Sequence, residues 1–257
     1  MSLTVRFYAE LVELSRRREL TLADGPLRSV KDVVESLGVP HPEVGLLLLD
    51  GVPVGFDHRV GGPADDGRDR RLAVFPPWRT LPLPAAATPT PAPGDPTRFV
   101  LDVHLGALAR RLRWLGMDCW YRRDADDAEL AAVAVDQVRI LLTRDRGLLR
   151  RGIVVHGYLP RADDPDAQTL EVVDRYGLVR HLDPGSRCVH CNARLEAVGP
   201  DEVAEVVPPR SLRAFNEFAR CRDCGRVFWP GSHHEALQEL LARIEAAGRD
   251  LGRDQRP

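Results

Sequence analysis

Residues 98–124 read RFVLDVHLGALARRLRWLGMDCWYRRD, and this stretch decides the fold class of the larger part of the chain. It opens with a run from Phe99 to Val103 that is apolar apart from one aspartate, which predicts a strand. Leucines at helical spacing follow as far as Gly116, which predicts a helix with a glycine C-cap. The segment DCWYR at 118–122 then predicts a second strand.

The alternation of strands and helices continues downstream. DADDAELAAVAVDQ predicts a helix, VRILLTRD a strand, GLLRRG a short helix and IVVHGYLP another strand, at residues 124–137, 138–145, 147–152 and 153–160. Strands that alternate with helices indicate βαβ units, in which a parallel sheet is covered by helices on both faces. We therefore expect a parallel-sheet α/β domain.

Residues 1–80 show a different order of elements. LTVRFYA alternates with period two and predicts a strand, SVKDVVESLG has helical spacing, VGLLLLDGVPV predicts a strand, a turn and a short strand, and RRLAVFPP predicts a last strand. This order suits an α+β roll in which one helix packs on a mixed sheet.

The segment between these two parts is rich in proline. Residues 81–97 read LPLPAAATPTPAPGDPT, with six prolines, and this composition favours extended polyproline II structure over a packed helix or a central strand. We interpret it as a semi-rigid linker. The predicted organisation is an N-terminal domain at 1–80, the linker at 81–97, an α/β domain at 98–180, and a cysteine-containing module with a C-terminal helix at 181–245.

The composition excludes several classes of protein. The chain of 257 residues is 44% hydrophobic and 29% charged, which is compatible with folded domains and not with global disorder. No apolar run approaches the ~18 residues that span a bilayer, and a signal-peptide pattern is lacking, so we expect a cytoplasmic protein without a membrane partner. The net charge of −2 argues against a uniformly basic nucleic-acid coat. Of 36 basic residues only Lys31 is a lysine, so a single arginine is weak support for phosphate binding.

Aspartates follow the predicted strands of the α/β domain. Asp102 lies near the end of the first strand, Asp145 directly follows the third, and Asp126 and Asp127 stand at the start of the second helix. The carboxyl ends of parallel strands converge on one crevice, so we expect these carboxylates close together. Mg²⁺ or Mn²⁺ would relieve their mutual repulsion, because hard cations prefer oxygen ligands and can activate water for attack on a phosphate.

Structural roles stay open for the same aspartates. Asp126 and Glu129 have the spacing of a helix capping box, and the helix dipole would favour Asp127 in the first turn. Asp145 could pair with the arginines on either side of it in ILLTRDR, although an exposed pair contributes only ~0–1 kcal/mol. Asp102 stands within an apolar run, where a charge needs a partner or a metal ion.

Two C-x-x-C motifs, CVHC and CRDC, predict a zinc site. Disulfides are rare in the cytosol, and four thiolates form a closed tetrahedral zinc site without an open position for water, so the zinc would be structural. The continuation CGRVFWPGSHH suits the hairpin of a zinc ribbon, and the fifth cysteine, Cys119, is expected in the core. The predicted ligands are Cys188, Cys191, Cys221 and Cys224, with His190, His233 and His234 as spare candidates.

FVLDVHLGALARRLRWLGMDCWYRRDADDAEL, followed by RILLTRDRGLLRR, resembles the PIN-like ribonuclease family named for the C-terminal region of the Mut-seven exonuclease. The resemblance covers about 98–245, including the cysteines. It implies a PIN-like domain with a zinc ribbon, cleavage of RNA, and metal binding by Asp102, Asp126, Asp127 and Asp145. The family often has a lysine, within LGKLAR, where this chain has Ala107.

Arginines near the aspartates fit an RNA substrate. One group, which includes Arg113, lies on the helix after Asp102, and another surrounds Asp145. Such arginines could hold the RNA backbone, and one of the first group would replace the missing lysine. A merely solvated face is the alternative for each of them. The predicted RNA contacts are Arg110, Arg111, Arg144 and Arg146.

VRFYAELVEL, PHPEVGLLLLDGVPVGFDHRV and DRRLAVFPPW resemble the ubiquitin-like β-grasp domains related to small sulfur carriers, over nearly all of 1–80. Those carriers end on a free Gly-Gly. Here the last strand continues into Trp78 and the linker, and Gly61-Gly62 lies in an internal turn. The resemblance therefore favours a role in protein binding or as a scaffold over a carrier activity.

Together these features predict a ribonuclease that hydrolyses RNA phosphodiester bonds with Mg²⁺ or Mn²⁺. Asp102, Asp127 and Asp145 would hold the ion, and Asp126 would be a supporting or alternate ligand. Two other functions stay open: an RNA-binding or adaptor protein that does not cleave, and a sulfur-transfer partner that acts through the β-grasp domain.

Overall fold

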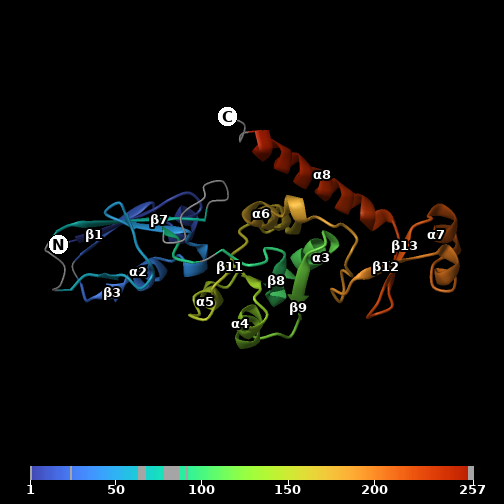
Figure 1. Cartoon of the computed structure of the whole chain (residues 1–257), viewed down its shortest axis with the longest axis horizontal. Helices are drawn as coiled ribbons and strands as arrows, with labels where there is room; N and C mark the ends of the chain where they lie inside the picture. Colours follow the sequence, from blue (N-terminus) through green and yellow to red (C-terminus); the bar gives the residue numbers. More distant parts are fainter. Residues whose placement is uncertain (1, 24, 63–67, 78–86, 91, 254–257) are drawn as a thin grey trace. The chain divides into compact units, whose positions relative to one another are not determined.

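The computed structural model of the chain describes residues 2–23, 25–62, 68–77, 87–90 and 92–253 (Figure 1). Contacts divide the chain into two compact units. The first comprises Met1–Gly94 and Asp127–Leu159, and the second comprises Asp95–Asp126 and Pro160–Pro257. Residues 81–86 and 91 of the predicted linker, and Trp78 before it, lie outside the described residues.

The N-terminal domain is built on a five-stranded sheet in the order β2-β1-β7-β4-β5. Its strands are β1 (Ser2–Phe7), β2 (Glu19–Ala23), β4 (Leu46–Leu49), β5 (Val52–Pro53) and β7 (Arg70–Phe75). β1 and β7 pair in parallel, and the other neighbours pair antiparallel. This mixed sheet, with its parallel pair β1 and β7 and the helix α2 (Val30–Ser36), is a β-grasp fold as predicted.

Helix α2 (Val30–Ser36) begins where the sequence pattern predicts it. The Ser29 hydroxyl accepts the Asp32 N–H at 3.0 Å, and the Asp32 carboxylate accepts the Ser29 N–H at 3.3 Å, which completes a capping box. Its apolar face is fully buried, and each such side chain contributes ~1.5–3 kcal/mol to stability. The remaining short elements are α1 (Leu11–Ser15), β3 (Arg28–Ser29), η1 (His41–Glu43) and β6 (Arg59–Val60).

The prediction for this domain missed α1 and β2. β2 is an outer strand of the sheet, and its side chains alternate only between exposed and half-buried. Its sequence, ELTLA, alternates but offers only two large apolar side chains, Leu20 and Leu22, which is a weak signal over so short a run. The predicted strand, turn and short strand are confirmed as β4 and β5, and Asp50 and Gly51 between them have positive φ.

In the second unit, β8 (Arg98–Leu101) pairs in parallel with β9 (Asp118–Tyr121). The turn η3 (Val103–Leu105) and helix α3 (Gly106–Trp114) connect them. Gly116 has φ +97°, which confirms the predicted glycine after this helix. A parallel pair joined by a helix is one βαβ unit.

The corresponding pair in the first unit is β10 (Ile140–Leu142) and β11 (Gly157–Tyr158), which are also parallel. Helix α4 (Asp127–Asp136) precedes β10, and α5 (Arg146–Leu149) lies between the two strands. The predicted parallel α/β class is therefore confirmed. β11 is shorter than the predicted strand at 153–160, because the chain runs through a bend and a turn before Gly157.

The cysteine-containing module forms a three-stranded antiparallel sheet. Its strands are β12 (Leu195–Val198), β13 (Phe218–Cys221) and β14 (Val227–Phe228). The other helices of this unit are α6 (Pro165–Tyr176), η4 (Leu178–His181), η5 (Pro200–Val203), α7 (Pro209–Ala214) and α8 (Ser232–Arg253). Within the described part of the chain, no helix combines the length and apolar character needed to cross a membrane.

Candidate functional site

Asp102 lies at the carboxyl end of β8, where the chain leaves the sheet. The residue is 6% exposed, and its backbone carbonyl accepts the Leu105 N–H at 2.9 Å. Its carboxylate does not cap η3, all of whose residues are described. Capping therefore does not explain why a carboxylate is buried at this strand end.

Asp145 follows β10 in an exposed loop that leads into α5. Its backbone N–H donates to Thr143 Oγ1 at 2.9 Å, and its Oδ1 accepts the Gly147 N–H at 2.6 Å. The carboxylate is thus the N-cap of α5. The two hydrogen bonds fix the backbone and one carboxylate oxygen, so the loop presents Asp145 in a defined orientation at the surface.

Asp127 is the first residue of α4, in the first turn as predicted. Its Oδ2 lies 3.8 Å from Arg151 Nη2, and the two side chains are 48% and 42% exposed. Such an exposed pair contributes only ~0–1 kcal/mol. Asp126 directly precedes the helix and is exposed.

These four aspartates belong to different units. Asp102 and Asp126 lie in the unit that contains β8, and Asp127 and Asp145 lie in the unit that contains β10. Their assembly into one metal site stays a prediction, and so do their individual roles as ligands.

Arg111 and Arg146, which were predicted to contact RNA, are bound by groups of the protein. Arg111 forms an ion pair with Asp166 of α6, and both side chains are largely covered. Arg146 Nη1 donates to the Leu14 carbonyl at 2.9 Å. Arg110 and Arg144 are exposed, and the RNA contacts of all four arginines stay a prediction.

The four cysteines of the two C-x-x-C motifs come together, with all sulfur atoms within 4.8 Å of one another. The Sγ atoms of Cys188 and Cys224 are 3.7 Å apart, and those of Cys191 and Cys221 are 3.3 Å apart. Tetrahedral zinc with Zn–S bonds of ~2.3 Å requires sulfur separations of roughly 3.8 Å. The donor set and its spacing are therefore compatible with zinc.

The thiols of this cluster differ in acidity. Burial raises the pKa of Cys188 to about 12, and burial also raises the pKa of Cys191. At Cys221 burial acts in the same direction, but hydrogen bonds from the backbone N–H groups of Cys224 and Asp223 and from the neighbouring thiols outweigh it and lower the pKa to about 7. The metal-free cluster therefore retains protons near neutral pH, and a bound cation would favour the thiolates.

Arg113 of α3 connects the first cysteine motif to β9. The residue is 3% exposed, and its Nε and Nη2 donate to the Cys119 carbonyl at 3.0 and 2.8 Å. Its Nη1 donates to the carbonyls of Val189 and His190 at 3.2 and 2.8 Å. The expectation that Arg113 belongs to an RNA-facing basic surface was wrong, because its guanidinium is buried among protein carbonyls.

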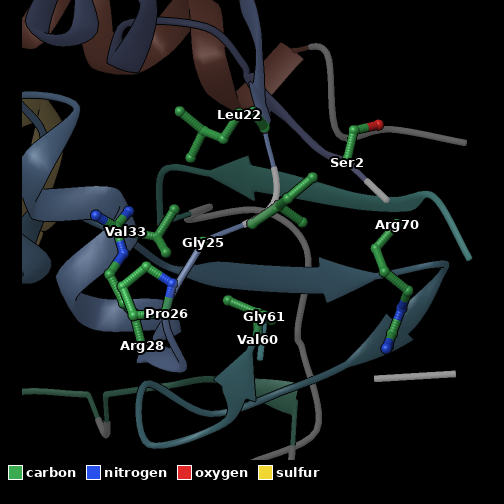
Figure 2. A pocket seen from close by; sticks show the side chains of 11 residues that line it. Ser2, Leu22, Gly25, Pro26, Arg28, Val33, Val60, Gly61 and Arg70 are labelled. Carbon is green, nitrogen blue, oxygen red and sulfur yellow. The ribbon is translucent and has the colours of Figure 1, made fainter. Parts of the chain in front are cut away.

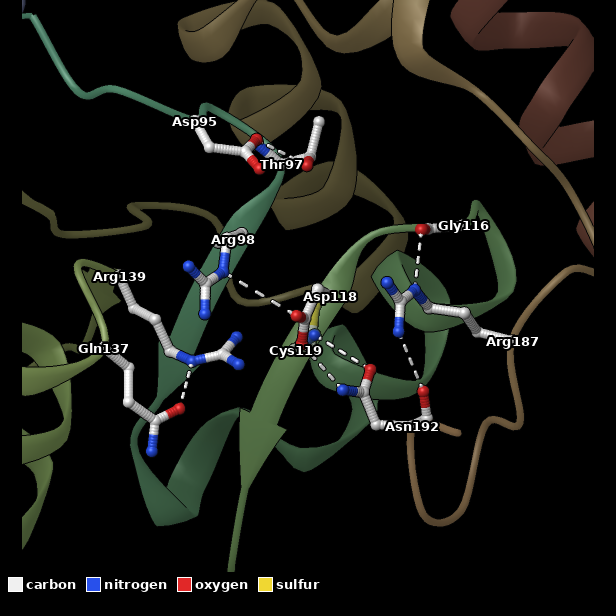
Figure 3. Close-up of polar contacts among 10 residues, drawn as sticks. All are labelled: Asp95, Thr97, Arg98, Gly116, Asp118, Cys119, Gln137, Arg139, Arg187 and Asn192. Atoms are coloured by element: carbon white, nitrogen blue, oxygen red, sulfur yellow. Dashed lines mark hydrogen bonds and ion pairs between the residues drawn. The ribbon is translucent and has the colours of Figure 1, made fainter. Parts of the chain in front are cut away.

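Asn192 and Arg187 add to this attachment (Figure 3). Asn192 Oδ1 accepts the Cys119 N–H at 2.9 Å, and its Nδ2 donates to Asp118 Oδ1 at 2.7 Å. Arg187 donates to the carbonyls of Gly116 and Asn192, at 3.1 Å each. Asn192 has φ +75°, a conformation that asparagine tolerates better than most residues. The sequence prediction missed these positions, and only the asparagine directly after CVHC gives a local signal for them.

The other predictions for this module concern single residues. Cys119 is fully buried, as expected for a core position. Among the spare ligands, the His190 ring lies 6.3 Å from the Phe228 ring. The side chains of His233 and His234 lie outside the described residues.

The β-grasp domain contains a pocket of about 190 Å³ (Figure 2). Apolar side chains such as Leu22, Val33 and Val60 line it, together with Arg28 and Arg70. None of the predicted site residues lines this pocket, so it is not part of the candidate site.

Comparison with known proteins identifies two domains in the chain. The family model described as Mut7-C RNAse domain matches residues 97–241, which is more than half of the chain, and the model described as Mut7-C ubiquitin matches residues 1–79. No curated protein matches the chain significantly.

Two solved structures also show similarity, at low identity and low TM-score. One is the putative molybdopterin converting factor, subunit 1, from Pyrococcus furiosus, with 16% identity, a TM-score of 0.24, and coverage of 30% of this chain and 99% of that chain. The other is SAMP1 from Haloferax volcanii, with 17% identity, a TM-score of 0.25, and coverage of 32% and 100%. The family match over 97–241 does not depend on them, and the chain belongs to the Mut7-C RNase family, with a Mut7-C ubiquitin domain at residues 1–79.

Proposed function

We propose that this protein is a divalent-metal-dependent ribonuclease that hydrolyses RNA phosphodiester bonds. One observation carries the proposal: a chain that belongs to an RNase family has an aspartate at each position where the sequence resemblance implies a metal-binding acid. The position of Asp102 at the carboxyl end of β8 agrees with it, because sites of α/β folds are usually built at the carboxyl ends of strands.

In this proposal Asp102, Asp127 and Asp145 hold Mg²⁺ or Mn²⁺, and Asp126 orients a ligand or replaces one. The bound ion would supply an activated water and would stabilise the leaving oxygen. The Gly147 N–H, which Asp145 Oδ1 accepts, would orient the Asp145 carboxylate and leave its second oxygen available. Arg110 and Arg144 would hold phosphates of the RNA backbone.

The four cysteines would bind zinc, with a purely structural role. Four thiolate ligands close the coordination sphere, so this site is separate in function from the aspartates. A cytoplasmic location is part of the proposal, since a reducing compartment would keep the five cysteines reduced.

A second candidate function is RNA binding without cleavage. Ala107 of α3 favours it, because the resemblance often places a lysine at this position and no ammonium group can reach a phosphate from here. In this alternative the β-grasp domain would recruit a protein partner. Sulfur transfer is less well supported, because Pro76 and Pro77 follow β7 and Gly61 and Gly62 lie inside the chain.

The deciding experiment compares wild type with Asp145→Asn in cleavage of single-stranded and structured RNA, with Mn²⁺, Mg²⁺ or EDTA. Asparagine keeps the oxygen that caps α5, so the variant is expected to fold. We expect cleavage only with metal in wild type, and a loss of at least about 100-fold in the variant, because even residues that merely orient metal ligands contribute 10–100-fold. Asp136→Asn, at the exposed end of α4, is the matched control and should cleave normally.

Zinc content is measured in every sample, so that a damaged cysteine module is not mistaken for a loss of chemistry. If wild type and Asp145→Asn bind RNA equally and neither cleaves any of these RNAs, the binding function replaces the nuclease as the better account.

A further inference from the structure

The β-grasp domain contacts the segment of the RNase domain that surrounds β11. β11 pairs with β10, and the turn η1 of the β-grasp domain also contacts it. Gly157 in β11 is buried, and a Cβ atom added there would lie 3.6 Å from Pro42 Cβ and 2.5 Å from Leu149 Cδ2. The two chain segments therefore approach each other closely, within a single compact unit.

We call the contact region between the β-grasp domain and the segment around β11 the junction. His41 makes the first polar contact across it. Its Nε2 lies 2.7 Å from the Val154 carbonyl, which can only accept, so Nε2 donates. Its Nδ1 lies 2.7 Å from Glu35 Oε1, and the ring lies edge-on to Phe56 at 5.8 Å. His41 is 6% exposed and Val154 is fully buried, so the hydrogen bond between them lies in the protein interior.

Glu43 makes the second contact. Its Oε1 accepts the Leu159 N–H, directly after β11, at 2.7 Å, and the residue has no exposed surface. A buried carboxylate needs hydrogen-bond donors, and the backbone of a strand at a sheet edge needs partners for its own polar groups. The hydrogen bond from the Leu159 N–H to Glu43 Oε1 gives the carboxylate a donor and gives the Leu159 backbone an acceptor.

Arg146 makes the third contact, next to Asp145. Its Nη1 donates to the Leu14 carbonyl at 2.9 Å and lies 3.5 Å from the Gly38 carbonyl. Gly38 has φ +100°, and a Cβ atom there would lie 2.9 Å from the Leu14 oxygen, so only glycine fits beside this carbonyl. The β-grasp domain thus binds the side chain of Arg146, the residue that directly follows the proposed metal ligand Asp145.

We propose that the β-grasp domain is a permanently docked positioning domain of this protein. Its residues 38–43 cover the segment around β11, and its Leu14 carbonyl holds Arg146 and thereby the loop of Asp145. The docking follows from the contacts at the junction alone, whereas the positioning role rests on the proposed function of Asp145 as a metal ligand. A mobile, tethered carrier fits less well, because undocking would expose apolar surface and break the hydrogen bonds of His41 and Glu43 to their backbone partners.

Docking is tested by cutting the folded chain. A recognition site for a specific protease is inserted directly after Gly94, where a Cβ atom would meet no neighbour, and the cut protein is passed over a gel-filtration column at micromolar concentration. We expect the fragments 1–94 and 95–257 to elute together. Separation of two folded fragments would overturn the docked domain, whatever the protein does to RNA.

A matched pair of variants locates the contact. Glu43→Ala removes the acceptor for the Leu159 N–H, and Glu43→Gln keeps an oxygen in its place. We expect the alanine variant to weaken the association of the cut fragments at least about tenfold, and the glutamine variant to weaken it less, because a buried N–H left without an acceptor is costly. Equal affinity of Glu43→Ala and wild type would remove this residue from the junction.

Positioning is tested by Mn²⁺ binding to the zinc-loaded, uncut protein, followed by electron paramagnetic resonance. Arg146→Ala should raise the Kd for Mn²⁺ by roughly tenfold, the lower end of the range for residues that orient metal ligands. Arg146→Lys can still reach a carbonyl and should recover part of the affinity. Arg17→Ala, exposed in the β-grasp domain, should bind Mn²⁺ as wild type does.

The outcomes separate the two proposals. If Arg146→Ala binds Mn²⁺ as wild type does but binds RNA more weakly, Arg146 is an RNA contact and its positioning role is overturned. If wild type binds no Mn²⁺, the proposed metal site fails and Arg146 loses that role with it. The cut-chain experiment still decides the docking in both cases.

Discussion

We call the cysteine-containing module, with its four predicted zinc ligands, the zinc module. It and the β-grasp domain are joined to their neighbours in different ways. At the zinc module a side chain of the RNase fold, Arg113, donates to backbone carbonyls of the cysteine motif. At the β-grasp junction the appended domain supplies the side chains of His41 and Glu43 to backbone groups of the RNase segment, and Arg146 of that segment donates to the Leu14 carbonyl. The first attachment requires the CVHC loop to hold its shape, which a metal would enforce, whereas the second requires only that the β-grasp domain is folded.

The largest difference between the two regions should follow removal of zinc. Structural zinc contributes on the order of 10 kcal/mol in small metal-dependent modules, so chelation or Cys188→Ser should unfold the module around β12, β13 and β14. The β-grasp domain and its junction contain no ligand of this site and should keep their structure. Hydrogen exchange measured by mass spectrometry should show lost protection at 186–228 and retained protection at 30–49.

A protein that contains no zinc as purified, and that keeps protection at 186–228 in Cys188→Ser, would contradict this prediction. Loss of protection in both regions would instead show that the β-grasp domain depends on the zinc module.

Removal of the Arg113 side chain should have the next largest effect. Arg113→Ala leaves the Cys119, Val189 and His190 carbonyls without this donor, and we expect a loss of about 3 kcal/mol in the free energy of unfolding of the zinc-loaded protein. Arg113→Lys keeps the charge but cannot reach all of these carbonyls, so it should be intermediate. Arg110→Ala, exposed on the same helix, should change stability by less than about 0.5 kcal/mol. Denaturant titration measures all three.

These two regions also mark how far the sequence predicts the structure. Leu108, Leu112 and Leu115 are fully buried, and the helix that their spacing predicts is confirmed. This prediction was possible because the spacing of apolar residues along a helix is a local property of the sequence. The cysteine pairs predict their own cluster for a similar reason, since each C-x-x-C motif specifies metal ligands by itself. Helical spacing and the paired cysteines therefore predict the first helix of the α/β domain and the four-cysteine cluster from local sequence alone.

Arg113 and His41 could not be assigned in this way. Arg113 follows Leu112 and is one of several arginines on the same helix, yet two of its partners lie 76 and 77 residues further along the chain. His41 reaches across 113 residues to Val154. Nothing near either residue in the sequence encodes such partners, so their roles depend on the tertiary structure.

Acidification offers a smaller perturbation of the zinc module. Because burial raises the pKa of Cys188 to about 12 and also raises that of Cys191, zinc binding at pH 8 should release protons from both thiols. Cys221, with a pKa of about 7, is mostly ionised at pH 8, so protons compete with zinc for this thiolate only below about pH 7. Zinc affinity should therefore fall as the pH falls, and more steeply below pH 7. Calorimetry in two buffers of different ionisation enthalpy measures the proton release, and an affinity independent of pH would contradict the prediction.

The smallest effect tests the fit of the β-grasp junction without touching a polar group. In Gly157→Ala the new methyl would lie 2.5 Å from Leu149 Cδ2 and 3.6 Å from Pro42 Cβ. Leu149 can shift, so we expect a loss of about 1 kcal/mol in the free energy of unfolding, the lower end for an overpacked core. Gly152→Ala, a nearby position where a Cβ atom meets no neighbour within 4 Å, is the control and should be neutral. If Gly157→Ala also weakens the association of the cut fragments, Pro42 packs tightly against Gly157 and the β-grasp domain docks in one defined position. If the loss of stability appears without any change in association, the strain is confined to the contacts with Leu149 and the Leu141 carbonyl, and the polar contacts of His41, Glu43 and Arg146 hold the junction.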